Sequence, residues 1–390
     1  MRIALISPLS EAVPPRLYGG TERVVHALAE ELVSRGHDVT LFASGDSRTS
    51  ARLIACVPRA LRFDAGCRDG LAPHLAMLER VTEMASEFDL IHNHADYLAY
   101  PFVKRWAAPA VTTLHGRLDL PELLPLYARF NDVNLISISD RQRAPLDAVR
   151  PNWTRTVYNG VNLRHFTFSP NPGRYLVFLG RVSEEKRPDL AVAVARQVGM
   201  PIKIAAKIDA ADREWSARHF EPLLDDPLVD FLGEVDEDAK AGLLRGAAAL
   251  LFPTMWPEPF GMVMIEALAC GTPVVALRHG SVPEVIRDGV NGFIRDDVAG
   301  MAQAVLRIAD IDRRACRASV EERFSAARMA DGYEAAYAQV LESGAPGCLR
   351  PAGAHGSGAG AEFVPARRPS VALRRLPVDD HLDLASRAER

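Results

Sequence analysis

The segment from residue 247 to residue 277 places a strand, a loop, a helix and a second strand in direct succession. Apolar residues fill 247–252 and 274–277 without interruption, as in strands that are buried on both faces of a parallel sheet. The helical run between them, 262–270, contains no helix breaker. Two strands joined through a helix in this way lie parallel in one sheet, so the segment predicts an α/β fold.

The same alternation of strands and helices occurs in two series along the 390 residues. The first half has an amphipathic helix at 21–34, for which Thr21 is the expected N-cap. A linker is expected at 159–173, where prolines interrupt the pattern. We therefore predict two Rossmann-like domains, 1–165 and 170–325. Strands are expected at 3–7, 39–43, 90–92, 110–114, 134–138, 175–179, 202–206 and 229–232, and further helices at 189–197, 239–245 and 326–341.

Composition excludes several classes of protein. A net charge of −4 argues against a general nucleic-acid binder, and the five scattered cysteines have no metal or redox spacing. No secretory signal or membrane-spanning apolar run is visible, which favours a cytoplasmic protein. Residues 344–390 are rich in Gly, Ala, Pro and Arg, and this composition predicts disorder.

Two carboxylates, Glu258 and Glu266, flank the turn Pro259-Phe260-Gly261 at the start of the helical run. The preceding strand brings this turn to the carboxyl edge of the sheet, where open α/β folds bind ligands. The free backbone N–H groups of a helix N-terminus suit a phosphate, and a glycine lets the ligand approach the backbone. The two acids are thus placed to contact separate parts of one bound molecule.

A cationic group, Gly180-Arg181 and Lys186, follows the strand at 175–179 and precedes a helix. Arg181 and Lys186 could neutralise a diphosphate in the bound state and as it leaves. Because Glu184, Glu185 and Arg187 are adjacent, a solvated charge cluster explains the same residues. The presence of the paired carboxylates favours the functional interpretation.

Weaker signals surround these two motifs. Gly19-Gly20 is either a phosphate-binding helix start or an ordinary turn, and His115 lies at a strand end where it can reach a ligand. His92 and His94 share one face without a third metal ligand, so structural roles are favoured. Helix capping explains Asp236 and Asp238 better than a metal–diphosphate site does. Glu284, in the segment 279–284, either binds a ligand or caps a helix.

Taken together, these motifs resemble glycosyltransferase family 4, the retaining, group 1 transferases with the two-domain GT-B fold. Glu258 and Glu266 carry the most specific part of the resemblance, with Gly180-Arg181, Lys186 and Gly19-Gly20 in support. The resemblance covers residues 1 to about 340. It implies that the first domain binds the acceptor, the second binds a nucleotide sugar, and a helix at 326–343 crosses back to the first domain.

The resemblance also implies a role for each site residue. Arg181 and Lys186 would hold the diphosphate, Glu266 would bind the ribose hydroxyls, and Glu258 would face the donor sugar. His115 would lie at the reacting face, near the donor sugar. The reaction would require no metal or other cofactor. The expected donor-binding residues are Gly20, Gly180, Pro259, Phe260, Gly261, Met262, Val263 and Glu266.

The predicted activity is the transfer of a hexosyl unit from a UDP- or GDP-linked sugar to a carbohydrate or lipid-linked acceptor, in glycan, glycolipid or cell-envelope synthesis. A non-catalytic sugar-nucleotide-binding protein and a phosphorylase of the GT-B fold remain as alternatives. Arginines in the loops of the first half leave an anionic acceptor or peripheral contact with the inner membrane face open, although amphipathic helices on a soluble domain are the favoured explanation. The acceptor and the oligomeric state are not predicted.

Overall fold

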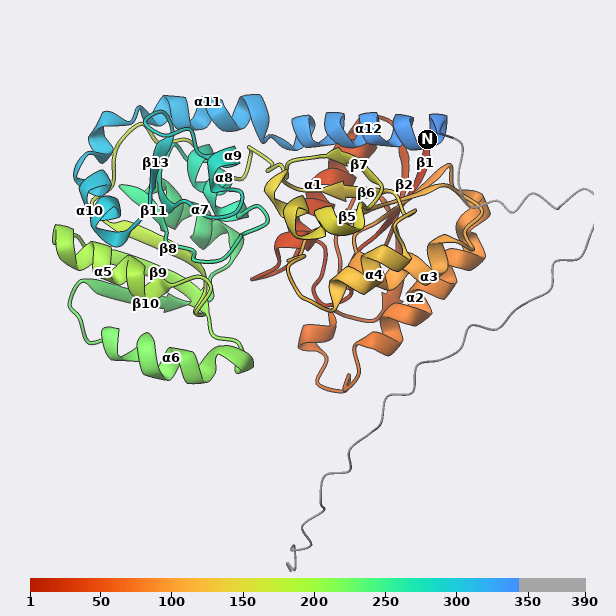
Figure 1. Ribbon diagram of the computed structural model, residues 1–390, viewed down its shortest axis with the longest axis horizontal. Helices are drawn as coiled ribbons and strands as arrows, with labels where there is room; N and C mark the ends of the chain where they lie inside the picture. Colours follow the sequence, from red (N-terminus) through yellow and green to blue (C-terminus); the bar gives the residue numbers. More distant parts are fainter. Residues whose placement is uncertain (344–390) are drawn as a thin grey trace, which may run out of the picture. The chain divides into compact units, whose positions relative to one another are not determined.

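The computed structural model describes residues 1–343, which contain two β-sheets whose paired strands all run parallel (Figure 1). The first sheet has the order β3 (Arg52–Val57), β2 (Asp38–Ser44), β1 (Arg2–Ile6), β4 (Leu90–Asn93), β5 (Ala110–Leu114), β6 (Leu135–Ser137) and β7 (Trp153–Thr156). The second has the order β10 (Val229–Gly233), β9 (Ile202–Lys207), β8 (Leu176–Arg181), β11 (Ala249–Phe252), β12 (Val274–Leu277) and β13 (Gly292–Arg295).

Helices cover both faces of the first sheet. Successive side chains of β1 point to opposite faces, so Ile3 and Leu5 join one core cluster while Ala4 and Ile6 join another. The first cluster includes α1 (Gly20–Ser34) and α12 (Ala326–Glu342), and the second includes α2 (Leu71–Met84). Shorter helices complete this half: α3 (Tyr100–Val103), α4 (Leu123–Arg129) and the 3-10 helix η4 (Arg141–Val149).

One large core cluster joins the second sheet to its helices. Its central strands β11 and β12 are buried along their whole length, which is why their sequences are uninterruptedly apolar. The helices of this half are α5 (Pro188–Val198), α6 (Arg213–His219), α7 (Glu237–Arg245), α8 (Met262–Ala269), α9 (Val282–Val285), α10 (Val298–Leu306) and α11 (Arg313–Arg323).

The last described helix, α12, follows the second series in the chain but packs in the first half of the molecule (Figure 1). It contacts α1, β5 and β7. Tyr333 and Tyr337 are fully buried, and the Tyr337 hydroxyl lies 2.7 Å from Nδ1 of His92 on β4. An ion pair of 2.5 Å between Arg35 and Glu334 secures the same helix at the surface.

The predicted α/β fold with two Rossmann-like halves is confirmed, and the ranges for β5 and β12 match residue for residue. Two local predictions are wrong. Thr21 does not cap α1, because the helix begins at Gly20 and Gly19 is its N-cap. Gly180 and Arg181 do not follow their strand but form its last two residues. The predicted disorder of 344–390 lies outside the described residues.

Candidate functional site

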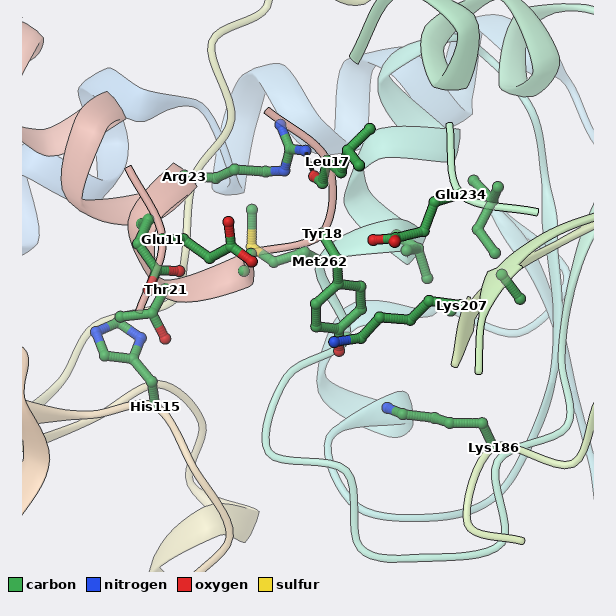
Figure 2. Close-up of a pocket in the computed structure, with 18 of the residues that line it drawn as sticks. Glu11, Leu17, Tyr18, Thr21, Arg23, His115, Lys186, Lys207, Glu234 and Met262 are labelled. Carbon is green, nitrogen blue, oxygen red and sulfur yellow. Dashed lines mark hydrogen bonds between the residues drawn. The ribbon is translucent and has the colours of Figure 1, made fainter. Parts of the chain in front are cut away.

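A cavity of about 800 Å³ opens where strands of both sheets end. Figure 2 shows Glu11, Thr21 and His115 of the first half facing Lys186, Lys207 and Glu234 of the second. The cavity is lined by every predicted site residue except Arg181: Gly20, His115, Gly180, Lys186, Glu258, Pro259, Phe260, Gly261, Met262, Val263 and Glu266. The fold therefore brings two distant motifs of the sequence to one place.

The turn at 259–261 leads directly into α8, and the residues of the turn line the cavity together with the first residues of the helix. Gly261 has φ +78°, a conformation that side-chain-bearing residues rarely adopt. A Cβ there would lie 2.9 Å from side-chain atoms of Phe252 and Met264, so any other residue would also force these side chains to shift. Ser139 of the first half donates a 2.6 Å hydrogen bond to the carbonyl of Pro259, and Ser281 donates one to Phe260. These bonds hold the turn in place from both halves.

Lys186 and Glu258 form an ion pair on the cavity wall although 72 positions separate them in the chain. Both side chains are mostly buried. The Trp256 indole donates a 2.8 Å hydrogen bond to Glu258, and the Lys186 ammonium lies 5.2 Å from the centroid of the same indole. The pair presents an ammonium and a carboxylate side by side, suited to a ligand with both anionic and hydroxyl groups.

Arg181 departs from the expected arrangement. Its guanidinium lies 3.2 Å from the Asp212 carboxylate and 3.1 Å from Glu185, and it is not among the cavity-lining residues. Glu185 also binds Arg117 of the first half at 2.5 Å. Attraction to three carboxylates, those of Glu185, Asp209 and Asp212, holds the Arg181 guanidinium beside the cavity.

The Glu266 carboxylate is buried and its two oxygens have different environments. Oε1 accepts a 2.7 Å hydrogen bond from Nζ of Lys240 on α7. Oε2 has no hydrogen-bond partner within residues 1–343. Burial lowers the pKa of Lys240, and the charge of Glu266 opposes that shift.

Three histidines meet at the ends of β4 and β5. His115 lines the cavity, and its Nε2 lies 2.8 Å from Nδ1 of His94. Burial lowers the pKa of His115 to about 3, so its imidazole is neutral at physiological pH and can both donate and accept hydrogen bonds. His92 is bonded to Thr113 and Tyr337 in the core, which confirms the structural role expected for it.

Family models match the chain in two adjoining stretches. The model described as Glycosyltransferase Family 4 matches residues 18–165, and that described as Glycosyl transferases group 1 matches residues 162–318. The chain belongs to the group 1, family 4 glycosyltransferases. The second stretch contains Lys186, Glu258 and Glu266, and the first contains His115.

Individual relatives agree with this family. The chain is 29% identical over 343 residues to the phosphatidyl-myo-inositol mannosyltransferase of Mycolicibacterium smegmatis, covering 80% of this chain and 86% of that one. Sucrose-phosphate synthase from Thermosynechococcus elongatus has a similar fold, with a TM-score of 0.73 and 20% identity over 88% of this chain and 99% of that one. HepE from Anabaena, solved in complex with UDP and glucose, gives a TM-score of 0.68 and 19% identity over 88% and 100%. The two-domain fold is therefore GT-B.

This glycosyltransferase also places in the cavity several residues that the sequence motifs did not reveal. Lys207 is the last residue of β9 and Glu234 directly follows β10, so the general rule that parallel strands end at one sheet edge would have found both. Glu11 and Glu22 had no such signal, because their burial depends on how the loop at 8–19 folds. Burial raises the pKa of Glu22 to about 7.

Tyr18 reaches across the cavity of the transferase from the first half. Its ring lies beside the Lys207 side chain in Figure 2, with the ammonium 4.3 Å from the ring centroid. Arg62 makes a second crossing, since it pairs with Glu11 at 2.8 Å and with Glu234 at 2.7 Å. Side chains of both halves thus meet directly over the cavity.

Two further acidic residues, Glu284 and Asp236, have structural contacts. Glu284 accepts hydrogen bonds from the backbone N–H groups of Asp140 and Arg141, so it joins the second half to the start of η4. Asp236 accepts the N–H of Ala239 and caps α7, as expected. Within residues 1–343, no group of three or more His, Cys, Asp and Glu could hold a metal ion.

Proposed function

We propose that this glycosyltransferase moves a hexosyl unit, with retention of anomeric configuration, from a UDP- or GDP-linked sugar to an acceptor bound by the first half. The observation that carries the proposal is the Lys186–Glu258 pair beside the free N-terminus of α8, in a cavity that both halves line. The solved HepE complex with UDP and glucose supports a nucleotide-sugar donor, and the phosphatidyl-myo-inositol mannosyltransferase supports a lipid-linked or carbohydrate acceptor.

In this proposal the N–H groups at the start of α8 and the Lys186 ammonium bind the donor diphosphate. Glu258 accepts hydrogen bonds from hydroxyls of the donor sugar, while the free oxygen of Glu266 accepts those of the ribose. Arg181 adds a second cation to the diphosphate by exchanging its contact with Asp212 or Glu185. Gly20 lets the start of α1 approach the same phosphates.

The acceptor hydroxyl attacks the anomeric carbon from the face that the diphosphate leaves. The bond between that carbon and the phosphate oxygen breaks, and the departing phosphate takes the hydroxyl proton. Lys186 stabilises the charge that grows on the phosphate during this step. Neutral His115 donates a hydrogen bond at the reacting face, and closure of the two halves excludes water that would hydrolyse the donor.

We expect activity to survive removal of divalent metals, because Lys186 and Arg181 supply the positive charge that a metal would supply elsewhere. The assay follows UDP or GDP release from UDP-glucose, UDP-galactose and GDP-mannose with lipid and sugar acceptors, with and without EDTA. Rates that agree within about twofold are expected. A loss that Mg²⁺ or Mn²⁺ restores would contradict metal independence, and nucleotide binding without turnover in any combination would favour a non-catalytic protein. A pyridoxal absorbance band would favour a phosphorylase.

We also propose that the first half contacts an anionic membrane surface, at the cytoplasmic face. None of the helices between residues 1 and 343 combines the length and apolar content needed to cross a bilayer. Phe63, Leu71 and Leu75 nevertheless expose 42–49% of their surface around the start of α2. Arg59 and Arg68 are exposed in the same region, and neighbouring residues line the cavity. Apolar and basic side chains together favour an anionic interface.

Replacing Phe63, Leu71 and Leu75 together by serine should abolish most binding to phosphatidylglycerol vesicles, because the apolar contact is lost. Sedimentation with phosphatidylglycerol and phosphatidylcholine vesicles measures this effect, and high salt should weaken binding by the unmodified protein. Leu306→Ser is the control, since Leu306 is 72% exposed on α10 in the other half. Equal sedimentation of the triple variant and the unmodified protein would exclude this surface.

A further inference from the structure

The buried Glu266 carboxylate is only half satisfied. Its side chain is 3% exposed, Oε1 is bonded to Lys240, and Oε2 has no hydrogen-bond partner in the part of the chain that is described. Leaving a buried carboxylate oxygen without a hydrogen-bond partner costs more free energy than leaving a buried neutral group without one. Glu266 also lines the cavity, so a ligand can supply the missing hydrogen bond.

Lys240 is an unusual residue for its place on α7. It lies on the buried face of the helix, four positions before the fully buried Leu244. Its ammonium lies 2.7 Å from Glu266 Oε1, 3.4 Å from Glu237 Oε1 and 5.6 Å from the centroid of the Phe166 ring. The ammonium is thus held among fixed partners and fixes one oxygen of Glu266 in turn.

The same charges extend to the first half of the molecule. Glu237 forms an ion pair with Arg23 of α1 as well as with Lys240. Two basic and two acidic side chains therefore alternate from α1 to α8, in the order Arg23, Glu237, Lys240, Glu266. Lys240 is the member that contacts both carboxylates of the second half.

We propose that Lys240 is a positioning residue for the nucleotide: by binding Oε1 of Glu266, it leaves Oε2 directed at the ribose hydroxyls of a nucleoside diphosphate. This inference rests on the proposed function. A lysine that only joins α7 to α8 would affect every nucleotide alike. A positioning lysine affects only nucleotides that carry the ribose hydroxyls, and this difference can be measured.

The experiment measures dissociation constants by calorimetry for UDP and 2′,3′-dideoxy-UDP, and for the corresponding guanosine pair, on the whole chain. The variants are then measured with the uridine pair or the guanosine pair, whichever ribose form binds the unmodified protein. A hydrogen bond to a charged group contributes about 1.5–3 kcal/mol, so the unmodified protein should bind the ribose form roughly 10- to 100-fold more tightly than the dideoxy form. Glu266→Gln should remove most of this preference.

Lys240→Met should weaken binding of the ribose form by about tenfold or more and leave the dideoxy form within about twofold. Lys240→Gln, which keeps a hydrogen-bond donor and is milder for folding, should give a smaller loss with the same selectivity. Lys203→Met is the matched control, because Lys203 pairs with exposed Asp230 on an outer strand.

The remaining outcomes distinguish a failure of the Lys240 positioning role from a failure of the proposed function. Equal weakening of both nucleotide forms, or of neither, by Lys240→Met and Lys240→Gln would overturn the positioning role while leaving the proposed function intact. The same holds if the unmodified protein binds ribose and dideoxy forms equally. Failure of the unmodified protein to bind either UDP or GDP would overturn the proposed function, and the positioning role with it.

Discussion

Replacing Lys186 by alanine is expected to lower kcat by about 10²- to 10³-fold, the usual effect of removing one group that stabilises charge in a transition state. Lys186 lines the cavity beside the N-terminus of α8 and pairs with Glu258. Its ammonium is one of the cations that line the cavity proposed for the diphosphate. The substitution also leaves Glu258 without its partner, which adds to the loss because the carboxylate then faces the donor unneutralised.

Steady-state release of nucleoside diphosphate at saturating donor gives kcat, and calorimetry gives the affinity for the nucleotide product. The affinity should change less than kcat, since α8 N–H groups and Glu266 remain. Lys203→Ala is the control for loss of a lysine outside the cavity. A kcat within tenfold of the unmodified enzyme would show that the leaving group is stabilised elsewhere, and Arg181 would then be the next residue to test.

The second large effect is expected on stability. Tyr337→Ala should lower the free energy of unfolding by about 3–5 kcal/mol, as for other large aromatic side chains removed from a packed core. Tyr337 is fully buried between α12 and the first sheet, and its hydroxyl is bonded to His92. The substitution opens a cavity and leaves a buried imidazole nitrogen without its partner.

Equilibrium unfolding in urea, followed by circular dichroism, measures this change. Tyr337→Phe separates the two causes, because it removes only the hydrogen bond and should lower the free energy by about 1 kcal/mol. Leu341→Ala controls for substitution on the same helix, since Leu341 is 40% exposed and should change stability by less than about 0.5 kcal/mol. If Tyr337→Ala is as stable as Leu341→Ala, α12 does not contribute to the core in the way described.

The buried strands could be predicted because both of their faces are apolar, so β5 and β12 have no ambiguous residue at either end. The edge strands of the first sheet, β3 and β7, could not. Residues of β3 are half-exposed and mix Arg with apolar side chains, and β7 has the sequence Trp-Thr-Arg-Thr with no clear alternation. Such strands form because a neighbouring strand offers hydrogen bonds, a tertiary effect that local sequence does not record.

The residues of the candidate site likewise divide into those that the sequence could place and those that depend on tertiary packing. Lys186 and Glu258 could be assigned to one edge of a sheet, since each follows a parallel strand, and the structure brings them into contact. The orientation of Arg181 could not be predicted, because it depends on Asp212, which comes from a separate segment, and on how the loop after β8 places Glu185. Lys240 was not anticipated either, since its contact with Glu266 requires the packing of two helix faces.

The position of α12 also has a consequence for how the protein folds while the ribosome synthesises it. Met329, Tyr333 and Tyr337 of α12 belong to the same core cluster as Ile3 and Leu5 of β1. The strand that is synthesised first therefore completes its packing only after α12 has been synthesised. A nascent chain that has emerged only to residue 325 has α1 but not α12 on that face of the sheet, and the apolar surface left exposed would favour aggregation or chaperone binding. The amino-terminal half is therefore built from two separate segments of the chain. A fragment that ends at the linker would lack the α12 side chains that complete its hydrophobic core.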